Sequence, residues 1–314
     1  MNNLPKIALG TWSWGTGFAG GDQVFGNNLN AEDLQPVFDA AMQGGLNLWD
    51  TAAVYGMGSS ESLLAEFVQQ YPREEIVLST KFTPQIAGNG TNPVEDMLNI
   101  SLQRFNTDYM DIYWIHNPMD VEKWTPGLIQ LLKSGKVKRI GVSNHNLAQI
   151  KRANDILAQE GFSISAVQNH YSLLYRSSEE AGILDYCREN KITFFAYMVL
   201  EQGALSGKYN VANPLPKGSG RGQTYNKVLQ QLEELTDVMK EIGSSREASV
   251  AQVAIAWAIA KNTLPIVGVT KVAHVEDAIK AAQITLTPEE MQRLETLAIA
   301  TGVDTRGGWE NPMN

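Results

Sequence analysis

Short runs of β-forming residues alternate with longer amphipathic segments along nearly all of this 314-residue chain. Strands that alternate with helices form βαβ crossovers, and such crossovers give a parallel sheet. Eight units of this kind predict a closed (β/α)8 TIM barrel, with residues 1–314 in a single domain. The predicted strands are Lys6–Gly10, Leu46–Asp50, Ile76–Lys81, Met110–Ile115, Val137–Ser143, Ile164–Asn169, Ile192–Met198 and Pro265–Gly268.

The amphipathic segments predict the helices around the barrel. Two helix starts, Asn92-Pro93-Val94-Glu95 and Thr287-Pro288-Glu289-Glu290, have the residue order of a capped N-terminus. An irregular stretch at about 199–225 follows the seventh strand, and loops of this length are usually either functional or disordered. We therefore expect a mobile flap there rather than an idle insertion. The predicted helices are Leu34–Gln43, Ser60–Gln70, Val94–Phe105, Pro126–Ser134, Leu147–Ala158, Glu179–Asn190 and Leu229–Ile242.

The composition argues against several other classes of protein. A formal net charge of −9 disfavours non-specific nucleic-acid binding. The one cysteine, Cys187, permits no intramolecular disulfide, and its helical setting suggests a buried thiol rather than a nucleophile. The N-terminus resembles no signal peptide, and the longest apolar stretch, Val250–Ala260, is too short to cross a bilayer. These features predict a cytoplasmic protein with no membrane partner.

Polar residues follow the ends of several predicted strands. Asp50 and Lys81 end the second and third strands, His116 and Asn144 follow the fourth and fifth, and Tyr55 lies in the loop after the second. Barrel enzymes place their chemistry at the carboxyl ends of the strands. We therefore expect these side chains to meet at one mouth of the barrel.

This combination suits proton donation to a carbonyl oxygen. Asp50 can pair with Lys81, whose charge is expected to lower the pKa of Tyr55 from its usual value of about 10. Reduction should then slow at alkaline pH, as the phenol loses its proton. His116 can polarise the same oxygen. Each residue alone also has a structural interpretation: a buried ion pair, a loop tyrosine at the rim, or a histidine that caps a turn.

The motifs, in this order, resemble those of the aldo-keto reductases. The chain contains Gly10-Thr11-Trp12, Asp50-Thr51-Ala52-Ala53-Val54-Tyr55-Gly56-Met57-Gly58-Ser59-Ser60-Glu61, Ser79-Thr80-Lys81, Ile115-His116, Gly141-Val142-Ser143-Asn144, Gln168-Asn169 and Gly307-Gly308-Trp309-Glu310. The resemblance implies hydride transfer from a nicotinamide cofactor to the carbonyl carbon of an aldehyde or ketone. It makes Tyr55 the general acid, tuned by Lys81 and Asp50, with His116 orienting the carbonyl.

The resemblance also implies a cofactor site across the mouth. Ser143, Asn144 and Gln168 would hold the carboxamide, and Tyr197 would stack on the nicotinamide unless it only fills the barrel. The stretch at about 199–225 would close over the cofactor and is called the clamping loop below. The remaining implied cofactor contacts are Gly10, Thr11, Trp12 and Asp50 near the first two strands, Leu200, Gln202, Gly203, Lys208 and Arg221 in the clamping loop, and Gly268, Thr270, Lys271, His274 and Asp277 at the adenosine phosphate. Lys208 and Arg221 have a second interpretation as solvated surface charges.

The choice of cofactor rests on few positions. His274, Asp277 and Ala278 depart from the residues common in the family, which weakens the case for a tightly held 2′-phosphate. Lys208 and Lys271 remain, so we expect NADPH, with NADH or dual use as the alternative.

An aromatic mouth is expected to receive a small carbonyl substrate. Its implied pocket residues are Trp12, Trp14, Tyr55 and His116, joined by Trp309 from a C-terminal tail at about 298–314. Sugar aldehydes, dicarbonyls, pyridoxal and aromatic aldehydes all stay open, and no oligomeric state follows from the sequence.

Two other functions compete with reduction. One is a cofactor-binding regulatory subunit with slow turnover, like the β subunits of potassium channels. The other is a barrel glycosidase, which the lack of an acid opposite Glu201 disfavours. No histidine or cysteine pattern typical of a metal site is present.

Overall fold

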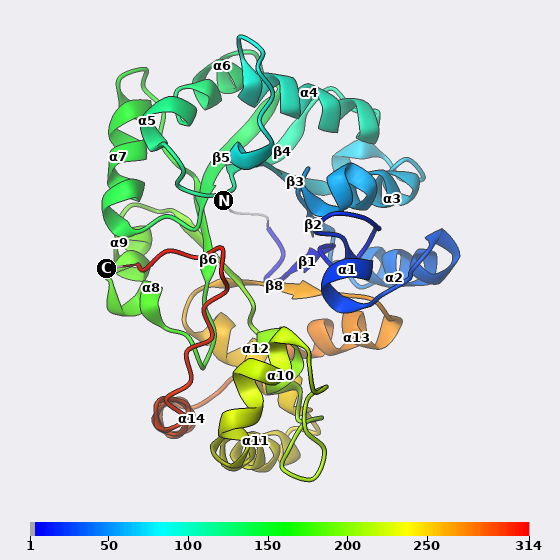
Figure 1. Cartoon of the computed structure of the whole chain (residues 1–314), viewed down its shortest axis with the longest axis vertical. Coiled ribbons are helices and arrows are strands. Elements are labelled where there is room, and N and C mark those ends of the chain that lie inside the picture. The colour runs from blue at the N-terminus through cyan, green and yellow to red at the C-terminus, as the bar shows by residue number, and fades with distance from the viewer. Residues whose placement is uncertain (1–3, 314) are drawn as a thin grey trace.

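Eight parallel strands close into a barrel in chain order, which confirms the predicted (β/α)8 fold (Figure 1). The structure is a computed structural model that describes residues 4–313. β4 and β5 begin and end where the sequence predicts, whereas β1 and β2 keep only the last three residues of their predicted runs. The strands are β1 Ala8–Gly10, β2 Leu48–Asp50, β3 Val77–Phe82, β4 Met110–Ile115, β5 Val137–Ser143, β6 Ala166–His170, β7 Thr193–Tyr197 and β8 Leu264–Gly268.

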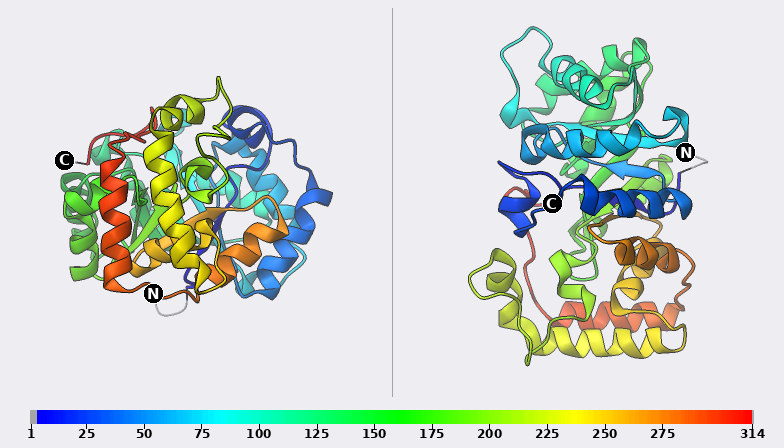
Figure 2. Two further views of the ribbon diagram at one scale, coloured as in Figure 1. Left: turned by 90° about the horizontal axis from the view of Figure 1, so that it is seen from below. Right: turned by 90° about the vertical axis from the view of Figure 1, so that its right-hand side faces the viewer.

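Helices surround the strands, and the two long helices α11 and α14 lie side by side at one side of the barrel (Figure 2). The predicted helix Glu179–Asn190 is instead two helices, α8 and α9, because the chain turns at Gly182 with φ 77°. The α-helices are α1 Gly21–Phe25, α2 Ala31–Gln43, α3 Ser59–Val68, α4 Pro93–Phe105, α5 Val121–Trp124, α6 Gly127–Lys133, α7 Leu147–Ala158, α8 Ser177–Glu180, α9 Ile183–Glu189, α10 Gly220–Tyr225, α11 Leu229–Ser244, α12 Val250–Ala260, α13 Val272–Ala281 and α14 Pro288–Ala300.

Short 3₁₀ turns lie in several of the connecting loops. They are η1 Tyr55–Gly58, η2 Arg73–Glu75, η3 Pro84–Ile86, η4 Glu201–Ser206 and η5 Asn226–Val228. The stretch at about 199–225 therefore contains η4 and α10 rather than irregular chain alone.

One of the two predicted helix caps is present. Thr287 and Glu290 form a complete capping box at the start of α14, as expected. The Asn92 side chain makes no capping hydrogen bond to α4, so that prediction is wrong. Its backbone ψ of 68° lies outside the extended conformation that aims a capping side chain at the helix.

The barrel interior is filled by side chains, with Trp114 at its centre. Its ring meets Phe195 edge to face at a centroid distance of 5.1 Å, and its indole N–H donates to the Ser79 hydroxyl over 2.6 Å. Gly141 on the neighbouring strand leaves the space that this ring fills. The interior cluster consists of Ala8, Leu48, Ile112, Trp114, Ala166, Phe195 and Leu264. A larger apolar core separates the strands from the helices and includes the buried thiol of Cys187, as predicted.

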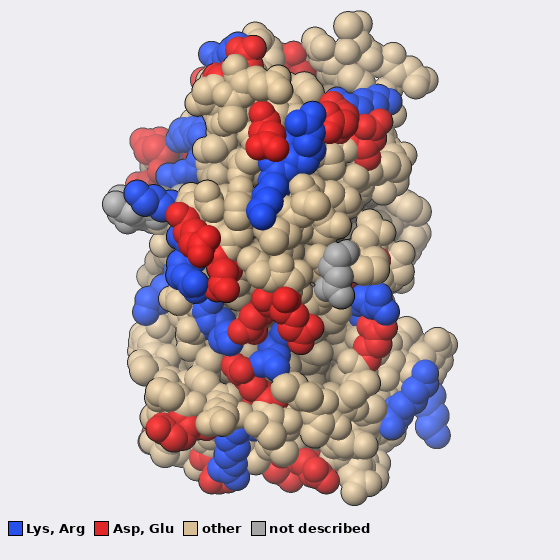
Figure 3. All heavy atoms as spheres, turned by 90° about the vertical axis from the view of Figure 1, so that its left-hand side faces the viewer, with Lys and Arg blue, Asp and Glu red and all other residues tan. Residues whose placement is uncertain are grey.

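The surface mixes charges of both signs. On the face drawn in Figure 3, acidic and basic side chains are interspersed rather than separated. Within residues 4–313, none of the helices combines the length and apolar character needed to cross a bilayer. In the same residues, no group of three or more His, Cys, Asp or Glu side chains could hold a metal ion.

Gly141→Ala tests how tightly this interior is packed. The added methyl would overlap the Trp114 ring and the Ala166 carbonyl, so we expect a loss of stability of about 1–3 kcal/mol in urea unfolding. Gly268→Ala in β8 is the matched control, because a methyl there meets no atom within 4 Å. Equal effects of the two substitutions would contradict this account of the core.

Candidate active site

A buried ion pair forms the base of the mouth. Lys81 Nζ lies 2.6 Å from Asp50 Oδ2, and the side chains are 0% and 5% exposed. The strand register explains the contact, because Asp50 pairs with Ser79 and Lys81 stands two residues further along β3. The ammonium also donates to the Thr51 carbonyl at 2.7 Å. These partners replace the water that both charges lose on burial.

The second oxygen of Asp50 is held from two further strands. Ser79 donates to Asp50 Oδ1 at 2.7 Å, and the Gln168 amide donates to the same oxygen at 3.2 Å. Ser79 in turn accepts from Trp114 at 2.6 Å. The carboxylate therefore links β2, β3 and β6 across the barrel.

Tyr55 lies over this pair, at the start of η1. Its ring centroid is 5.4 Å from Lys81 Nζ, and it stacks on Trp12 at 5.9 Å. The turn that carries it needs positive φ at Gly56 and Gly58, of 57° and 96°. Glycine takes this conformation without the usual steric cost, which explains the glycines after the tyrosine.

His116 completes the group after β4. Its ring meets that of Tyr55 edge to face, with centroids 5.9 Å apart. The Thr83 hydroxyl is 2.8 Å from His116 Nδ1, and the Asn144 amide donates to the His116 carbonyl at 2.9 Å. The structure thus brings together all four residues singled out in the sequence. Thr83 orients the imidazole, but it lies in no recognisable sequence motif and was therefore not predicted.

The electrostatics differ from expectation at Tyr55. Burial, and then the nearby Asp50 carboxylate, raise the pKa of Tyr55 above its ordinary value. The expected lowering by Lys81 is therefore wrong for the protein alone, because Asp50 already pairs with that ammonium. Burial also lowers the pKa of Lys81, opposed by Asp50. Burial, aided by Lys81, lowers the pKa of His116 to about 3, so its imidazole is neutral near pH 7.

The residues expected around a nicotinamide lie at the same mouth. Ser143 ends β5 and Asn144 follows it, and the Tyr197 hydroxyl at the end of β7 donates to Asn144 Oδ1 at 2.5 Å. Asn144 has a positive φ of 62°, which turns its side chain back toward His116. Gln168 is fixed by Asp50. Gly10 and Thr11 lie at the end of β1, where the Thr11 hydroxyl contacts the Asp50 carbonyl at 3.4 Å.

The clamping loop brings its glycine turn and Arg221 together. Arg221 in α10 donates to the Gln202 carbonyl at 3.1 Å, beside Gly203 with φ 96°. Leu200 precedes η4, and Lys208 is exposed beyond it. Both Lys208 and Arg221 lie over the Tyr209 ring, at 5.4 and 5.7 Å.

The chain after β8 leads into the N-terminus of α13. Lys271 occupies the N-cap position of α13, and its side chain makes no capping hydrogen bond to the first N–H groups of this helix. The Thr270 N–H donates to His274 at 3.2 Å. Asp277 accepts a hydrogen bond from Gln252 in α12, which ties it to helix packing. Gly268 is exposed at the end of β8.

A cavity of about 1080 Å³ lies next to Trp12, the residue that stacks on Tyr55, although none of the tetrad residues Asp50, Tyr55, Lys81 and His116 lines it. Trp12 lies at its wall, and the rings of Phe25 and Trp309 meet Trp12 edge to face at 5.1 and 5.6 Å. Trp14 does not contribute, which corrects its predicted pocket role. It is fully buried among Trp49 and Phe67, and its indole donates to the Val269 carbonyl.

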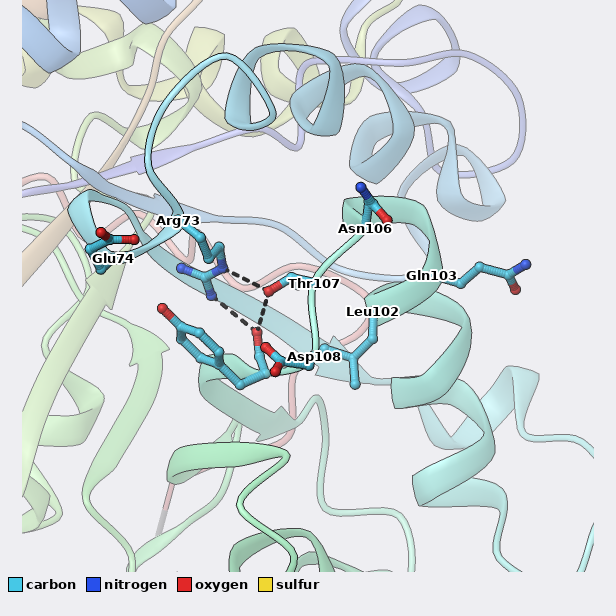
Figure 4. A pocket seen from close by; sticks show the side chains of 8 residues that line it. Arg73, Glu74, Leu102, Gln103, Asn106, Thr107 and Asp108 are labelled. Atoms are coloured by element: carbon cyan, nitrogen blue, oxygen red, sulfur yellow. Dashed lines mark hydrogen bonds between the residues drawn. The ribbon is translucent and has the colours of Figure 1, made fainter.

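A second pocket, of about 730 Å³, lies at the opposite end of the barrel, before β4 begins. Figure 4 shows Arg73 donating to Thr107 and to the Tyr109 carbonyl beside it. Arg73 also pairs with Asp111 at 2.7 Å. These groups satisfy one another, and the residues that line this pocket include no histidine. The mouth is the better candidate for chemistry.

Comparison with known proteins identifies the family of the chain. The model of the aldo/keto reductase family matches residues 6–299. The chain belongs to the aldo/keto reductase family. It is therefore an oxidoreductase, which confirms both the resemblance and the enzyme class expected from its motifs.

Individual relatives cover most of the chain. The chloroplastic pyridoxal reductase of Arabidopsis thaliana is 33% identical over 312 residues, covering 94% of this chain and 84% of that protein. An NADP(+) aldo-keto reductase of Schizosaccharomyces pombe is 30% identical, covering 84% and 82%. A thermostable aldo-keto reductase solved with the inhibitor epalrestat has a TM-score of 0.75 at 25% identity, covering 94% of this chain and 95% of that one.

The buried pair is expected to dominate stability at the mouth. Lys81→Met leaves Asp50 buried without its counter-ion, which should cost about 3–5 kcal/mol in urea unfolding. Adding Asp50→Asn should restore part of that loss, since no unpaired charge then stays buried. Lys133→Met is the control, because its pair with Glu160 is about half exposed and worth less than about 1 kcal/mol. If the losses of stability in the two single variants simply add up in the double variant, the pairing argument is contradicted.

Proposed function

We propose that the protein reduces the carbonyl group of a small aldehyde or ketone with hydride from NADPH. The observation that carries this is the arrangement at the mouth: the Tyr55 ring lies over the buried Lys81–Asp50 pair and beside His116. A proton donor, a fixed positive charge and a neutral imidazole thus lie close together at the carboxyl end of the barrel. A positioned proton donor catalyses reduction of a carbonyl, and donors aimed at its oxygen stabilise the negative charge that develops there.

The residues at the mouth fit a nicotinamide dinucleotide. The free N-terminus of the ten-residue helix α13, with Lys271 beside it, suits a phosphate group. Trp12 Nε1 is buried with no hydrogen-bond partner among residues 4–313, so a polar group on a bound molecule could accept from it. Ser143, Asn144 and Gln168 would hold the carboxamide, Tyr197 would stack on the ring, and Gln202, Gly203 and Arg221 would close over the pyrophosphate. When bound, the nicotinamide supplies the hydride.

Each member of the tetrad has one task in this mechanism. Tyr55 gives its phenolic proton to the carbonyl oxygen as negative charge develops there. Lys81 stabilises the phenolate left behind, and Asp50 holds the ammonium in place. His116 is neutral, so it donates one hydrogen bond to the oxygen without bringing a competing acid into the site.

Two observations favour NADPH over NADH: the positive charges near the expected phosphates, and the cofactor for which a relative is named. Lys271 at α13 and Lys208 in the clamp provide cations near the expected phosphates, whereas Asp277 is engaged with Gln252. The Schizosaccharomyces pombe relative is named for NADP(+). The Arabidopsis relative is named for pyridoxal, a planar aromatic aldehyde, and the Trp12–Phe25–Trp309 cluster offers faces on which such a ring could stack. Pyridoxal is therefore the first substrate to assay.

Tyr55→Phe separates catalysis from binding. We expect NADPH oxidation with pyridoxal and other aldehydes to fall by about 10²–10⁴-fold, since the general acid is gone. Calorimetry with NADPH and with NADH should give the same affinities as for wild type, because the phenol hydroxyl is not among the proposed cofactor contacts. Equal oxidation rates in the two proteins would exclude Tyr55 as the acid and favour a regulatory cofactor-binding role.

The pH profile of reduction should be a broad plateau. His116 has a pKa of about 3 and stays neutral above it, while burial raises the pKa of Tyr55 and keeps the phenol protonated at alkaline pH. The kcat for carbonyl reduction should therefore stay flat between about pH 5 and pH 9. A step near pH 6.5 that disappears in His116→Gln would mean that the imidazole titrates in the working enzyme.

A further inference from the structure

A second buried ionic cluster lies behind the mouth, and the proposed mechanism does not use it. His170 at the end of β6 contacts Glu201 Oε1 through Nε2 at 2.9 Å. Through Nδ1 it contacts both carboxylate oxygens of Glu310 at 3.0 Å. All three side chains are 0% exposed. Glu201 opens the clamping loop and Glu310 belongs to the C-terminal tail, so one imidazole joins two segments far apart in the chain.

Both ends of the clamping loop meet on Glu201. Its Oε2 accepts from the Tyr225 hydroxyl at 2.5 Å, and Tyr225 is the last residue of α10. Ser172 donates to Oε1, beside His170. The loop from 201 to 225 is thus closed at its base by a carboxylate that must stay ionised to accept these bonds.

The tail is attached to the same region at three points. Thr305 donates to Glu201 at 3.3 Å, Glu310 pairs with His170, and the Asn169 amide contacts the Met313 sulfur at 3.5 Å. Glu310 also closes its own turn, accepting from the Gly307 N–H at 3.2 Å. The turn fixed in this way carries Trp309.

Trp309 reaches from that turn over the mouth. Its ring meets Trp12 edge to face at 5.6 Å. Tyr197 stacks on the His170 ring at 5.5 Å, and Tyr175 also stacks on this ring, at 4.3 Å. The imidazole therefore touches the anchor of the tail and an aromatic residue of the cofactor site.

The cluster requires a charged imidazole. A neutral histidine donates from one nitrogen only, whereas two carboxylates here need a donor each. Burial lowers the pKa of His170, but Glu201 and then Glu310 outweigh it and raise the pKa to about 9. One positive charge thus bridges two negative ones at neutral pH.

We propose that His170 is a positioning residue whose bridge between Glu201 and Glu310 holds Trp309 over the mouth, so that substrate selection depends on the same contacts that close the clamping loop. This rests on the proposed function for its kinetic consequence. Its structural part, the coupling of tail to clamp, stands without any turnover. Planar aromatic aldehydes should gain from the fixed indole, and small dicarbonyls should not.

Glu310→Gln tests the coupling, because glutamine keeps the shape and removes the charge. Hydrogen exchange of the protein without cofactor should speed up about tenfold or more in residues 302–313, since a bond to a charged group is lost. Residues 201–207 should speed up as well, although they carry no substitution. Asp304→Asn is the matched control, since it removes a carboxylate from the same tail that is exposed and bonded to Arg306.

Kinetics supply the second readout. In Glu310→Gln, the KM for pyridoxal should rise about tenfold relative to that for methylglyoxal, with kcat for methylglyoxal within about threefold of wild type. His170→Gln should reproduce this selectivity change if Glu310→Gln fails to fold. Faster exchange in the tail with none at 201–207, or the same changes in Asp304→Asn, would overturn the proposal. Unchanged exchange in both segments would do so whether or not the enzyme reduces aldehydes.

Discussion

The contact between Lys81 and Asp50 is the constraint on which the mouth of this barrel depends. Two opposite charges without water are stable only where their remaining hydrogen-bonding capacity is met. Here Ser79, Gln168 and the Thr51 carbonyl meet it, and Trp114 fixes Ser79 from inside the barrel. The pair is therefore stable only in the closed barrel, which brings these partners together from different strands. The polar groups that bond to the pair are positioned by these same contacts.

The pair also sets the protonation of its neighbours. The ammonium lies close enough to His116 to disfavour a second positive charge, and the carboxylate opposes a negative charge on Tyr55. Both residues are thus kept in their neutral forms, each with a proton to donate. The expected lowering of the pKa of Tyr55 by Lys81 did not take Asp50 into account. Asp50 pairs with the Lys81 ammonium, and its negative charge raises the pKa of Tyr55.

Two segments cover the mouth, and buried polar contacts anchor both of them. Glu201 anchors the clamping loop, Glu310 anchors the tail, and His170 contacts both carboxylates. Apolar packing alone would hold such segments with little preference for one position, whereas hydrogen bonds to charged groups fix direction.

The sequence alone determined the barrel and its tetrad. Period-2 and period-3.6 patterns depend on neighbours in the chain, and parallel strands bring their carboxyl ends together, so Asp50, Lys81 and His116 were placed by order alone. The sequence did not predict that Trp14 is buried in the core, that Asn92 makes no capping hydrogen bond, or that His170 bridges two carboxylates. Those outcomes depend on which groups meet across long separations, as Glu310 meets His170, and on how much water each loses there. Desolvation and pairing are properties of the folded whole, which is why only the tertiary structure decided the charges and the anchors of the mouth.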